Sequence, residues 1–328
     1  MNYKAFKPAT GLSNRHIQTL FSTFFVRSKN INLDVEQFEL DDGDFLECHW
    51  YKRAKKGQDK PIVILFHGLA GSYNSPYIQG VMKAFSKNDF SVVLMHFRGC
   101  ATKENRLPRS YHSGETGDAK SFIKHLQKAY PNTSLFAVGY SLGGNMLLKM
   151  LGEYSFNTPL TAAVSVSAPM QLDICANKMN TGFSKFYQSH LLKDLNSSLL
   201  KKYKMHDMNS LLSVKENEVK KLKSFWEFDG AYTAPIHGFK SAQDYYTKSS
   251  AKQYLNDIQT DTVVIHALDD PFMTPEILPK EGEFSKKVTL EVFAHGGHVG
   301  FIGGSILKPE FYLEDRIVSY FKQFTRER

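Results

Sequence analysis

The sequence predicts one α/β domain with a mostly parallel sheet that helices cover on both faces. Strand-like apolar runs alternate along the chain with stretches whose apolar residues recur at helical spacing. The runs at 61–66 and 91–97 are apolar almost throughout, as strands are when both faces of a parallel sheet are covered. A length of 328 residues and a hydrophobic content of 42% suit one large domain or a domain with an insertion.

The first expected elements are an N-terminal arm and a β-hairpin. Residues 1–30 contain His16-Ile17-Gln18-Thr19-Leu20-Phe21, which is typical of a short arm or helix packed on the body of a domain. Weak amphipathic contact with a membrane surface is the alternative interpretation of this stretch. Alternation over 35–40 and 46–51, around Asp42-Gly43, predicts two antiparallel strands joined by a tight turn.

Strands alternating with helices follow the hairpin. Apolar residues at helical spacing predict helices around 78–85 and 122–130, and a C-terminal helix over 313–324. The sequence contains eight expected strands in all: 35–40, 46–51, 61–66, 91–97, 135–138, 161–167, 262–266 and 288–293.

Residues 170–255 interrupt this alternation. They contain no convincing β-α repeat and are rich in Lys, Asn, Ser, Phe and Tyr, which favours several helices inserted between strands. Open α/β sheets bind ligands at the carboxyl ends of their strands, where this insertion falls. We therefore predict a single domain over 1–328 with a helical cap at 170–255.

Cysteine spacing and hydropathy indicate the cellular compartment in which the protein is expected. Cys48, Cys100 and Cys175 are far apart and form no C-x-x-C pair, which argues against a disulfide framework and a thiolate zinc site. No stretch approaches the roughly 20 apolar residues of a membrane-spanning helix, and the N-terminus lacks the pattern of a signal peptide. We expect a soluble, cytoplasmic protein.

The formal charge of +8 is spread along the chain. We interpret the Lys and Arg residues mainly as solvated faces, with attraction to acidic substrates or a membrane surface as the alternative. No basic run is interleaved with aromatic residues, so nucleic acid is not an expected partner.

The sequence indicates no cofactor. It has neither G-x-G-x-x-G nor a P-loop, which argues against a nucleotide. His67, His96, His112 and His298 could meet at the sheet edge, but no metal-ligand spacing supports a metal site. Cys100 has no paired base in the sequence and is expected to be structural.

A candidate nucleophile stands in Gly139-Tyr140-Ser141-Leu142-Gly143. The apolar strand 135–138 precedes this G-x-S-x-G motif and a helical run follows it. In that context the serine occupies a sharp strand-to-helix turn that exposes its hydroxyl, and the glycines tolerate the tight backbone. Ser141 is therefore the predicted nucleophile.

A serine needs a base, and the base needs an acid that orients it. His298 follows the last strand after Gly296-Gly297 and is the predicted base, whereas His295 is expected to be a supporting or surface residue. Asp269 and Asp270 both follow the strand 262–266, and the usual spacing selects Asp270, with Asp269 as the alternative acid. A turn in which neither carboxylate is catalytic is the remaining interpretation.

Backbone N–H groups must also face the oxyanion of the reaction intermediate. We expect one from Leu142, directly after the nucleophile. The other is expected from Leu69, in the glycine-rich loop His67-Gly68-Leu69-Ala70-Gly71 that follows the strand 61–66.

Together these motifs resemble the YheT-like branch of the α/β-hydrolases. The resemblance covers nearly the whole chain and rests on His16 to Leu20, His67-Gly68-Leu69 with Gly71-Ser72, His96-Phe97-Arg98-Gly99-Cys100, Tyr111-His112-Ser113-Gly114, Gly139 to Asn145, Asp269-Asp270-Pro271-Phe272 and Gly296 to Phe301. The eight strands match the sheet of these enzymes. Relatives in this branch include eukaryotic membrane-associated lipases and yeast ethanol acyltransferases.

The resemblance implies a serine esterase-like or acyltransferase-like enzyme with Ser141, Asp270 and His298 as its triad. We expect cleavage of carboxylic esters through an acyl-enzyme; the alternatives are an acyltransferase that passes the acyl group to an alcohol, and a hydrolase-fold protein that binds a ligand without turnover. Arg98 and Tyr111 to Gly114 recur in the branch, and Arg98 either holds loops or binds an anionic substrate group.

Aromatic residues in the predicted cap suggest that the ester is a small molecule with an apolar acyl group. The same residues could instead form a small core of the cap itself. They are Phe183, Phe186, Tyr187, Phe225, Trp226 and Tyr232.

Overall fold

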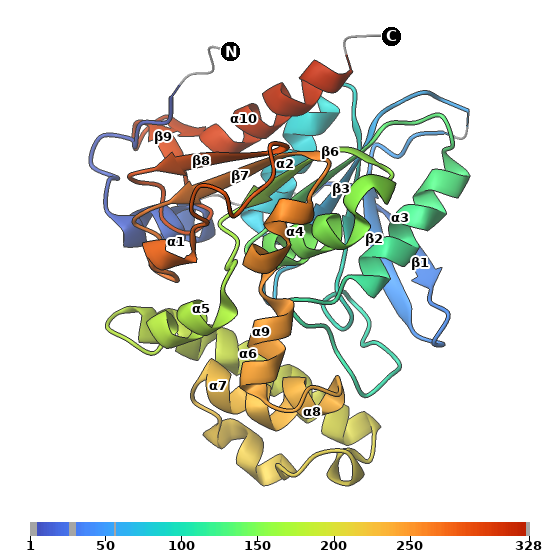
Figure 1. Cartoon of the computed structure of the whole chain (residues 1–328), viewed down its shortest axis with the longest axis vertical. Coiled ribbons are helices and arrows are strands. Elements are labelled where there is room, and N and C mark those ends of the chain that lie inside the picture. Colours follow the sequence, from blue (N-terminus) through green and yellow to red (C-terminus); the bar gives the residue numbers. More distant parts are fainter. Residues whose placement is uncertain (1–4, 26–30, 56, 326–328) are drawn as a thin grey trace.

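An eight-stranded sheet forms the centre of the protein, as Figure 1 shows for the computed structural model, which describes residues 5–25, 31–55 and 57–325. The strands lie in the order β1-β2-β4-β3-β5-β6-β7-β8. β2 pairs antiparallel with both β1 and β4, and all other neighbours are parallel. The strands are β1 Asp34–Glu39, β2 Phe45–Tyr51, β3 Ile62–Phe66, β4 Ser91–Met95, β5 Leu135–Tyr140, β6 Leu160–Val166, β7 Asp261–Ala267 and β8 Val288–Phe293.

Helices cover both faces of this sheet. The helices are α1 Arg15–Phe25, α2 Pro76–Ser86, α3 Gly117–Ala129, α4 Leu142–Tyr154, α5 Leu172–Met179, α6 Ser184–Met205, α7 Phe225–Phe228, α8 Ala234–Ile236, α9 Ala242–Ser249 and α10 Tyr312–Phe321. Short 3-10 turns are η1 Ser155–Asn157, η2 Met208–Ser210, η3 Glu216–Lys221, η5 Ala251–Asp257, η6 Pro275–Ile277 and η7 Lys322–Phe324, and η4 Asp229–Thr233 is a π-helical turn. α3 and α4 pack on one face, and α2 and α10 pack on the other.

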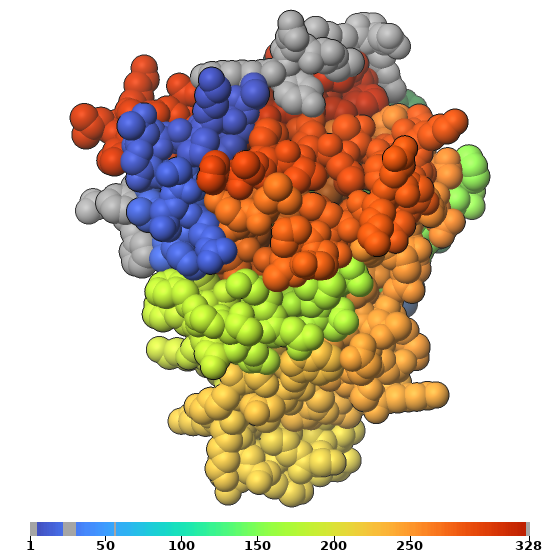
Figure 2. Space-filling view, turned by 60° about the vertical axis from the view of Figure 1, so that its left-hand side comes forward, coloured from blue at the N-terminus to red at the C-terminus, as the bar shows by residue number. Residues whose placement is uncertain are grey.

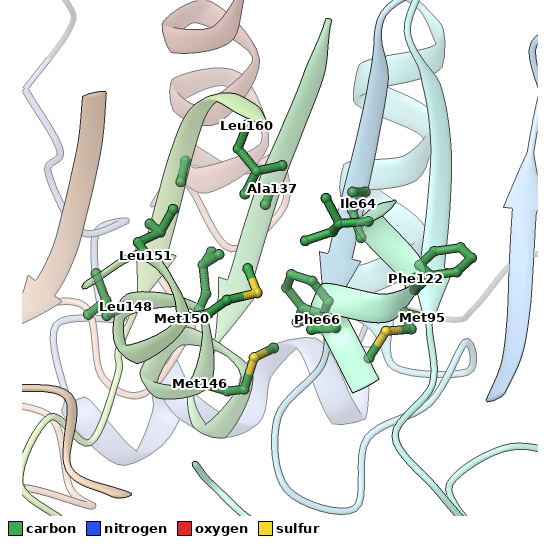
Figure 3. Packing of buried hydrophobic residues seen from close by; sticks show 14 of the residues in the cluster. Ile64, Phe66, Met95, Phe122, Ala137, Met146, Leu148, Met150, Leu151 and Leu160 are labelled. Atoms are coloured by element: carbon green, nitrogen blue, oxygen red, sulfur yellow. The ribbon is translucent and has the colours of Figure 1, made fainter. Parts of the chain in front are cut away.

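The continuous apolar strands follow from this double cover. Successive side chains of a strand point to opposite faces, so a strand covered on both sides buries every residue. In β3, Ile62, Ile64 and Phe66 pack in the cluster under α3 and α4, part of which Figure 3 shows. Val63 and Leu65 pack in the cluster under α2 and α10.

The predicted fold class and its eight strands are confirmed, with small shifts at the ends. β4 ends at Met95 and not at residue 97, and the C-terminal helix ends at Phe321, where the 3-10 turn η7 begins. A two-stranded sheet of β9 Ile302–Gly304 and β10 Pro309–Phe311 was not predicted. Each of its strands has three residues, too few for a recognisable alternation. Among the described residues, no helix combines the length and apolarity needed to span a membrane.

Between β6 and β7 the chain runs through α5 to α9, below the sheet in Figure 1. These helices have apolar clusters of their own, one of which contains Leu199, Met208 and Tyr232. Ala251 and Leu255, in η5, pack instead with α4 in the cluster of the main sheet. By its packing, the helical insert extends to about residue 250.

Arg98 connects the hairpin to α3. Its guanidinium is 2% exposed and donates hydrogen bonds to Asp118, Asp42 and Asp44 at 2.6–3.0 Å. Burial opposes its charge, but the hydrogen bonds and charges of Asp118 and Asp42 raise the pKa of Arg98 above its ordinary value. The structure supports the loop-holding interpretation, and the alternative in which Arg98 binds an anionic substrate group is wrong.

Glu314, on α10, makes stability depend on pH. Its carboxyl lies over Gly80 of α2, where a Cβ would come within 1.9 Å of Oε1. Burial, followed by the charge of Asp315, raises its pKa from 4.5 to about 7 against the opposing charges of Lys87 and Lys83. Between these two values the folded state keeps a proton that the unfolded state has lost, so stability falls as the pH rises and levels off above the folded pKa.

We expect Glu314→Gln to stabilise the protein above neutral pH, because glutamine cannot become charged in this partly buried place. The free energy of unfolding should exceed that of the wild type by about 1–3 kcal/mol near pH 8 and by little near pH 4.5. Urea unfolding across this range measures the difference, with the exposed Glu281→Gln as the matched control. A constant difference at every pH would contradict the prediction.

Candidate active site

Ser141 occupies a tight turn between β5 and α4. Its backbone has φ 51° and ψ −118°, a conformation that a residue with a side chain rarely adopts. Its glycine neighbours permit this turn: a Cβ at Gly139 would meet the Gly143 carbonyl at 2.4 Å, and one at Gly143 would meet the His67 carbonyl at 2.5 Å. The strand-turn-helix context that the G-x-S-x-G motif requires is therefore present.

The structure brings His298 and Asp270 to this serine. Nε2 of His298 lies 2.9 Å from Oγ of Ser141, and Nδ1 lies 2.8 Å from Oδ2 of Asp270. Asp270 is 2% exposed, and its other oxygen accepts a hydrogen bond from the N–H of Phe272 at 2.8 Å. The three side chains form one continuous line of hydrogen bonds from a buried carboxylate to a serine hydroxyl.

Asp269 has different partners. Its Oδ1 accepts a hydrogen bond from the N–H of Gly297 at 2.9 Å, and its Oδ2 lies 3.2 Å from Nδ1 of His295. Asp269 thus holds the loop that carries His298 without contacting the His298 ring. Of the two acids left open by the sequence, Asp270 faces the imidazole.

Both predicted oxyanion donors lie beside Ser141. A Cβ at Gly68 would contact the Ser141 Cβ at 3.3 Å, which places the loop that follows β3 against Ser141. In that loop the N–H groups of Gly68, Ala70 and Gly71 each have an acceptor. Within the described part of the chain, the N–H groups of Leu69 and Leu142 have none, and both residues line the cavity at Ser141.

Phe272 belongs to the motif Asp269-Asp270-Pro271-Phe272, but the sequence indicated no role for it. Its ring stacks on the His298 imidazole with centroids 4.0 Å apart and planes at 9°. Tyr187 of α6 also packs against Phe272, with centroids 5.0 Å apart and planes at 46°. The stacked ring restricts the plane of the imidazole, so Phe272 is a positioning residue for His298; its signal in the sequence is its place in the motif two residues after Asp270.

Helix α1 supports the histidine loop, and Figure 2 shows this N-terminal segment, in blue, against the orange segments that precede the C-terminus. Thr19 Oγ1 accepts a hydrogen bond from the N–H of His298 at 2.9 Å. The amide of Gln18 is fully buried and bonds both backbone groups of Ile302 and the carbonyl of Leu12. The predicted arm is therefore a helix that holds the loop carrying His298.

We expect Gln18→Leu to destabilise the protein and to lower its activity. The substitution leaves three buried backbone groups without their partner, which costs about 2–4 kcal/mol. Thermal unfolding and the rate of ester hydrolysis measure the two effects, with the exposed neighbour Ile17→Ala as the control. Unchanged stability would show that α1 contributes no support to this loop.

A cavity of about 400 Å³ opens at Ser141 between the sheet and the helical insert. Leu69, Leu142 and Phe272 line its end at the serine. The six aromatic residues singled out in the sequence divide among three environments. Phe225 and Tyr232 line the cavity, Trp226 and Tyr187 pack within the protein, and Phe183 and Phe186 are more than half exposed.

The stretch Tyr111 to Gly114 connects the insert to the sheet. Tyr111 stacks on Phe97, and its hydroxyl accepts a hydrogen bond from the N–H of Ala70 in the loop His67 to Gly71. The N–H of Ser113 donates to the hydroxyl of Tyr245 in α9. This motif therefore positions the loop His67 to Gly71 and the base of the insert relative to each other.

The four histidines considered for convergence at the sheet edge have other partners in the structure. Both ring nitrogens of His67 and of His96 bond to backbone groups, and burial lowers the pKa of His67 to about 4. His298 is occupied by the serine and the aspartate. Cys100 packs beside the cavity, where burial raises the pKa of its thiol to about 12 and leaves it unreactive.

One other set of possible metal ligands exists among the described residues. Donor atoms of His112, Glu115 and His237 lie within 4.8 Å of one another. The Glu115 carboxylate already pairs with Arg109 at 2.9 Å, so its negative charge is neutralised by a fixed cation. Together with burial, the charge of Arg109 also lowers the pKa of His237, to about 4. A further cation would be repelled here, and we assign no metal.

Comparison with known proteins agrees with this geometry. A family model described as alpha/beta hydrolase fold matches residues 61–305. The chain is 43% identical over 312 residues to YheT of Escherichia coli (strain K12), a protein named as a predicted esterase, and the match covers 95% of this chain and 91% of that protein. It is 27% identical over 315 residues to the phospholipase ABHD3 of Mus musculus, covering 94% of this chain and 75% of that protein.

Among solved structures, the esterase Pf2001 of Pyrococcus furiosus is similar with a TM-score of 0.57. The match covers 98% of this chain and 99% of the other, at 17% sequence identity. At that identity the likeness concerns the fold alone.

Proposed function

This chain belongs to the alpha/beta hydrolase fold family, within it to the YheT-like branch, and from that premise we propose that it is a serine esterase acting through Ser141, His298 and Asp270. The observation that carries the proposal is the line of hydrogen bonds from Asp270 through His298 to Ser141. A protein that only binds a ligand has no chemical need for this set.

The geometry supports a two-step reaction. A proton on Nδ1 of His298, donated to Asp270, leaves Nε2 free to accept the proton of the Ser141 hydroxyl. The serine oxygen then attacks the ester carbonyl carbon, and the carbonyl oxygen becomes an oxyanion that the N–H groups of Leu69 and Leu142 stabilise. His298 returns the proton to the leaving alcohol, and the acyl group stays on Ser141.

Water completes the cycle in the second step. His298 takes a proton from a water molecule, the resulting hydroxide attacks the acyl carbon, and the proton returns to Ser141 as the carboxylic acid leaves. An alcohol in place of this water gives a new ester, so hydrolysis and acyl transfer share the same residues. Apolar residues at the serine end of the cavity favour a small ester with an apolar acyl group.

Labelling with a fluorophosphonate probe tests the nucleophile directly. The folded wild-type protein should become modified at Ser141 and lose its hydrolysis of short-chain p-nitrophenyl esters in parallel. A folded protein that neither reacts with the probe nor turns over any ester would favour the binding alternative. Adding ethanol and measuring ethyl ester against free acid then separates acyl transfer from hydrolysis.

A further inference from the structure

Asp229 is a carboxylate in the wall of the cavity that opens at Ser141. It begins the π-helical turn η4, between α7 and α8 of the insert. Turns of this kind are rare and often stand at functional sites. The proposed ester reaction gives this residue no task, since the base and its acid are both supplied by the loops after β7 and β8.

Only part of the hydrogen-bonding capacity of the Asp229 carboxylate is used by the described residues. Thr233 Oγ1 donates a hydrogen bond to its Oδ1 at 2.6 Å, and the Tyr246 hydroxyl donates to its Oδ2 at 2.7 Å. An ionised carboxylate has about four acceptor positions, so roughly two remain. Within the described residues, no Lys, Arg or His forms an ion pair with Asp229.

Burial raises the pKa of Asp229 to about 6, and the hydroxyls of Thr233 and Tyr246 oppose this shift. Near neutral pH the group is therefore largely ionised, in a place that disfavours its charge. An asparagine would bond to both hydroxyls without that cost, because its oxygen accepts from one and its NH2 group donates to the oxygen of the other. A charged acceptor that faces a substrate cavity with open positions is instead suited to a hydrogen-bond donor brought by the ligand.

We propose that Asp229 is a substrate-binding group that accepts a hydrogen bond from a hydroxyl of the ester, so that the preferred substrates are hydroxylated esters. This inference rests on the proposed esterase function. An ammonium group would have to give up much stronger hydration than a hydroxyl to enter a cavity with largely apolar walls, which favours the neutral donor. In this arrangement the ester carbonyl of the substrate lies at Ser141 and its hydroxyl lies at Asp229. The distance between these two residues along the cavity therefore determines the preferred spacing of the two groups in the substrate.

Two matched pairs of esters test the proposal and identify which half of the substrate carries the hydroxyl. One pair is the p-nitrophenyl ester of a straight-chain acid with and without a terminal hydroxyl group; the other is the glycerol monoester and the propyl ester of one acid. The readout is the ratio of kcat/KM within each pair. We expect the wild type to prefer the hydroxylated ester by about tenfold to a hundredfold in one pair, as a hydrogen bond to a charged group allows.

Variants at Asp229 should remove this preference. Asp229→Leu should bring the ratio to within about threefold of unity, and Asp229→Asn, which keeps the shape and removes the charge, should lower it by about tenfold. Asp257→Asn, an exposed aspartate outside the cavity, is the matched control and should keep the wild-type ratio. If Asp229→Leu does not fold, as judged by circular dichroism, the ratio in Asp229→Asn decides.

Several outcomes would overturn the proposal. They are equal rates for both members of each pair in the wild type, an unchanged preference in the Asp229 variants, or a stronger preference for an amino-substituted ester than for the hydroxylated one. These outcomes leave the plain esters hydrolysed and the esterase function intact. A wild-type protein that hydrolyses no ester at all would instead contradict the proposed function itself.

Discussion

Ser141→Ala is expected to lower kcat/KM for ester hydrolysis by about 10⁴- to 10⁶-fold. Alanine removes the only atom that forms the acyl-enzyme, and His298 and Asp270 then have no nucleophile to activate. The oxyanion donors at Leu69 and Leu142 are backbone groups and remain, which is why some residual rate above the uncatalysed reaction is expected. Initial rates on a p-nitrophenyl ester measure the loss.

The fold should tolerate this substitution, since alanine is smaller than serine and the strained backbone of the turn is held by its glycine neighbours. Equal thermal unfolding of Ser141→Ala and wild type would show that the loss is chemical and not structural. Ser210→Ala, on the far part of the insert, serves as the matched control and should keep full activity. Equal rates for Ser141→Ala and wild type would rule out the proposed nucleophile.

The second large effect is expected from substitutions of the adjacent carboxylates Asp270 and Asp269. Asp270→Asn should lower kcat by about 10⁴-fold, because an amide in place of the carboxylate no longer holds the His298 proton on Nδ1 and cannot stabilise the imidazolium. Asp269→Asn should cost about tenfold or less, since Asp269 holds only the N–H of Gly297 and the exposed ring of His295. The same kinetic assay on both variants measures the contrast.

Each of these two variants is the other's control, because they change one atom at adjacent positions. A large loss in Asp269→Asn with a small loss in Asp270→Asn would mean that the working enzyme uses the other acid. Similar moderate losses in both would mean that neither carboxylate has the role proposed for Asp270.

Local patterns in the sequence predict much of the fold. The continuous apolar runs of β3, β4 and β5 need cover on both faces, and that requirement alone indicates the parallel sheet. Turn chemistry identifies the hairpin at Gly43, whose φ of 83° suits glycine. The short strands β9 and β10 could not be predicted in this way. They depend on contacts with the N-terminal segment, such as the hydrogen bond from the N–H of Ala9 to the carbonyl of Ile302, and no local pattern reveals such contacts.

The residues of the candidate site also divide into those that the sequence predicts and those that only the structure reveals. Ser141 and His298 stand in motifs whose glycines mark the loops that carry them, so the sequence suffices to propose them. The choice between Asp269 and Asp270 depends on which carboxylate turns toward the imidazole, a matter of one residue in a loop. Phe272 and Gln18 stand in motifs that carry the family resemblance, but their contacts depend on partners distant in the chain, and Asp229 stands in no motif at all.

The bond between Gln18 and Ile302 joins residues 284 positions apart. During synthesis the N-terminal helix leaves the ribosome long before the segment it must hold, and contacts of such separation form late because closing a long loop is costly. A partly made chain can therefore already contain the serine turn but not a supported histidine. Support of the loop that carries His298 is therefore expected to form late in folding, once α1 has packed against the segment around Ile302.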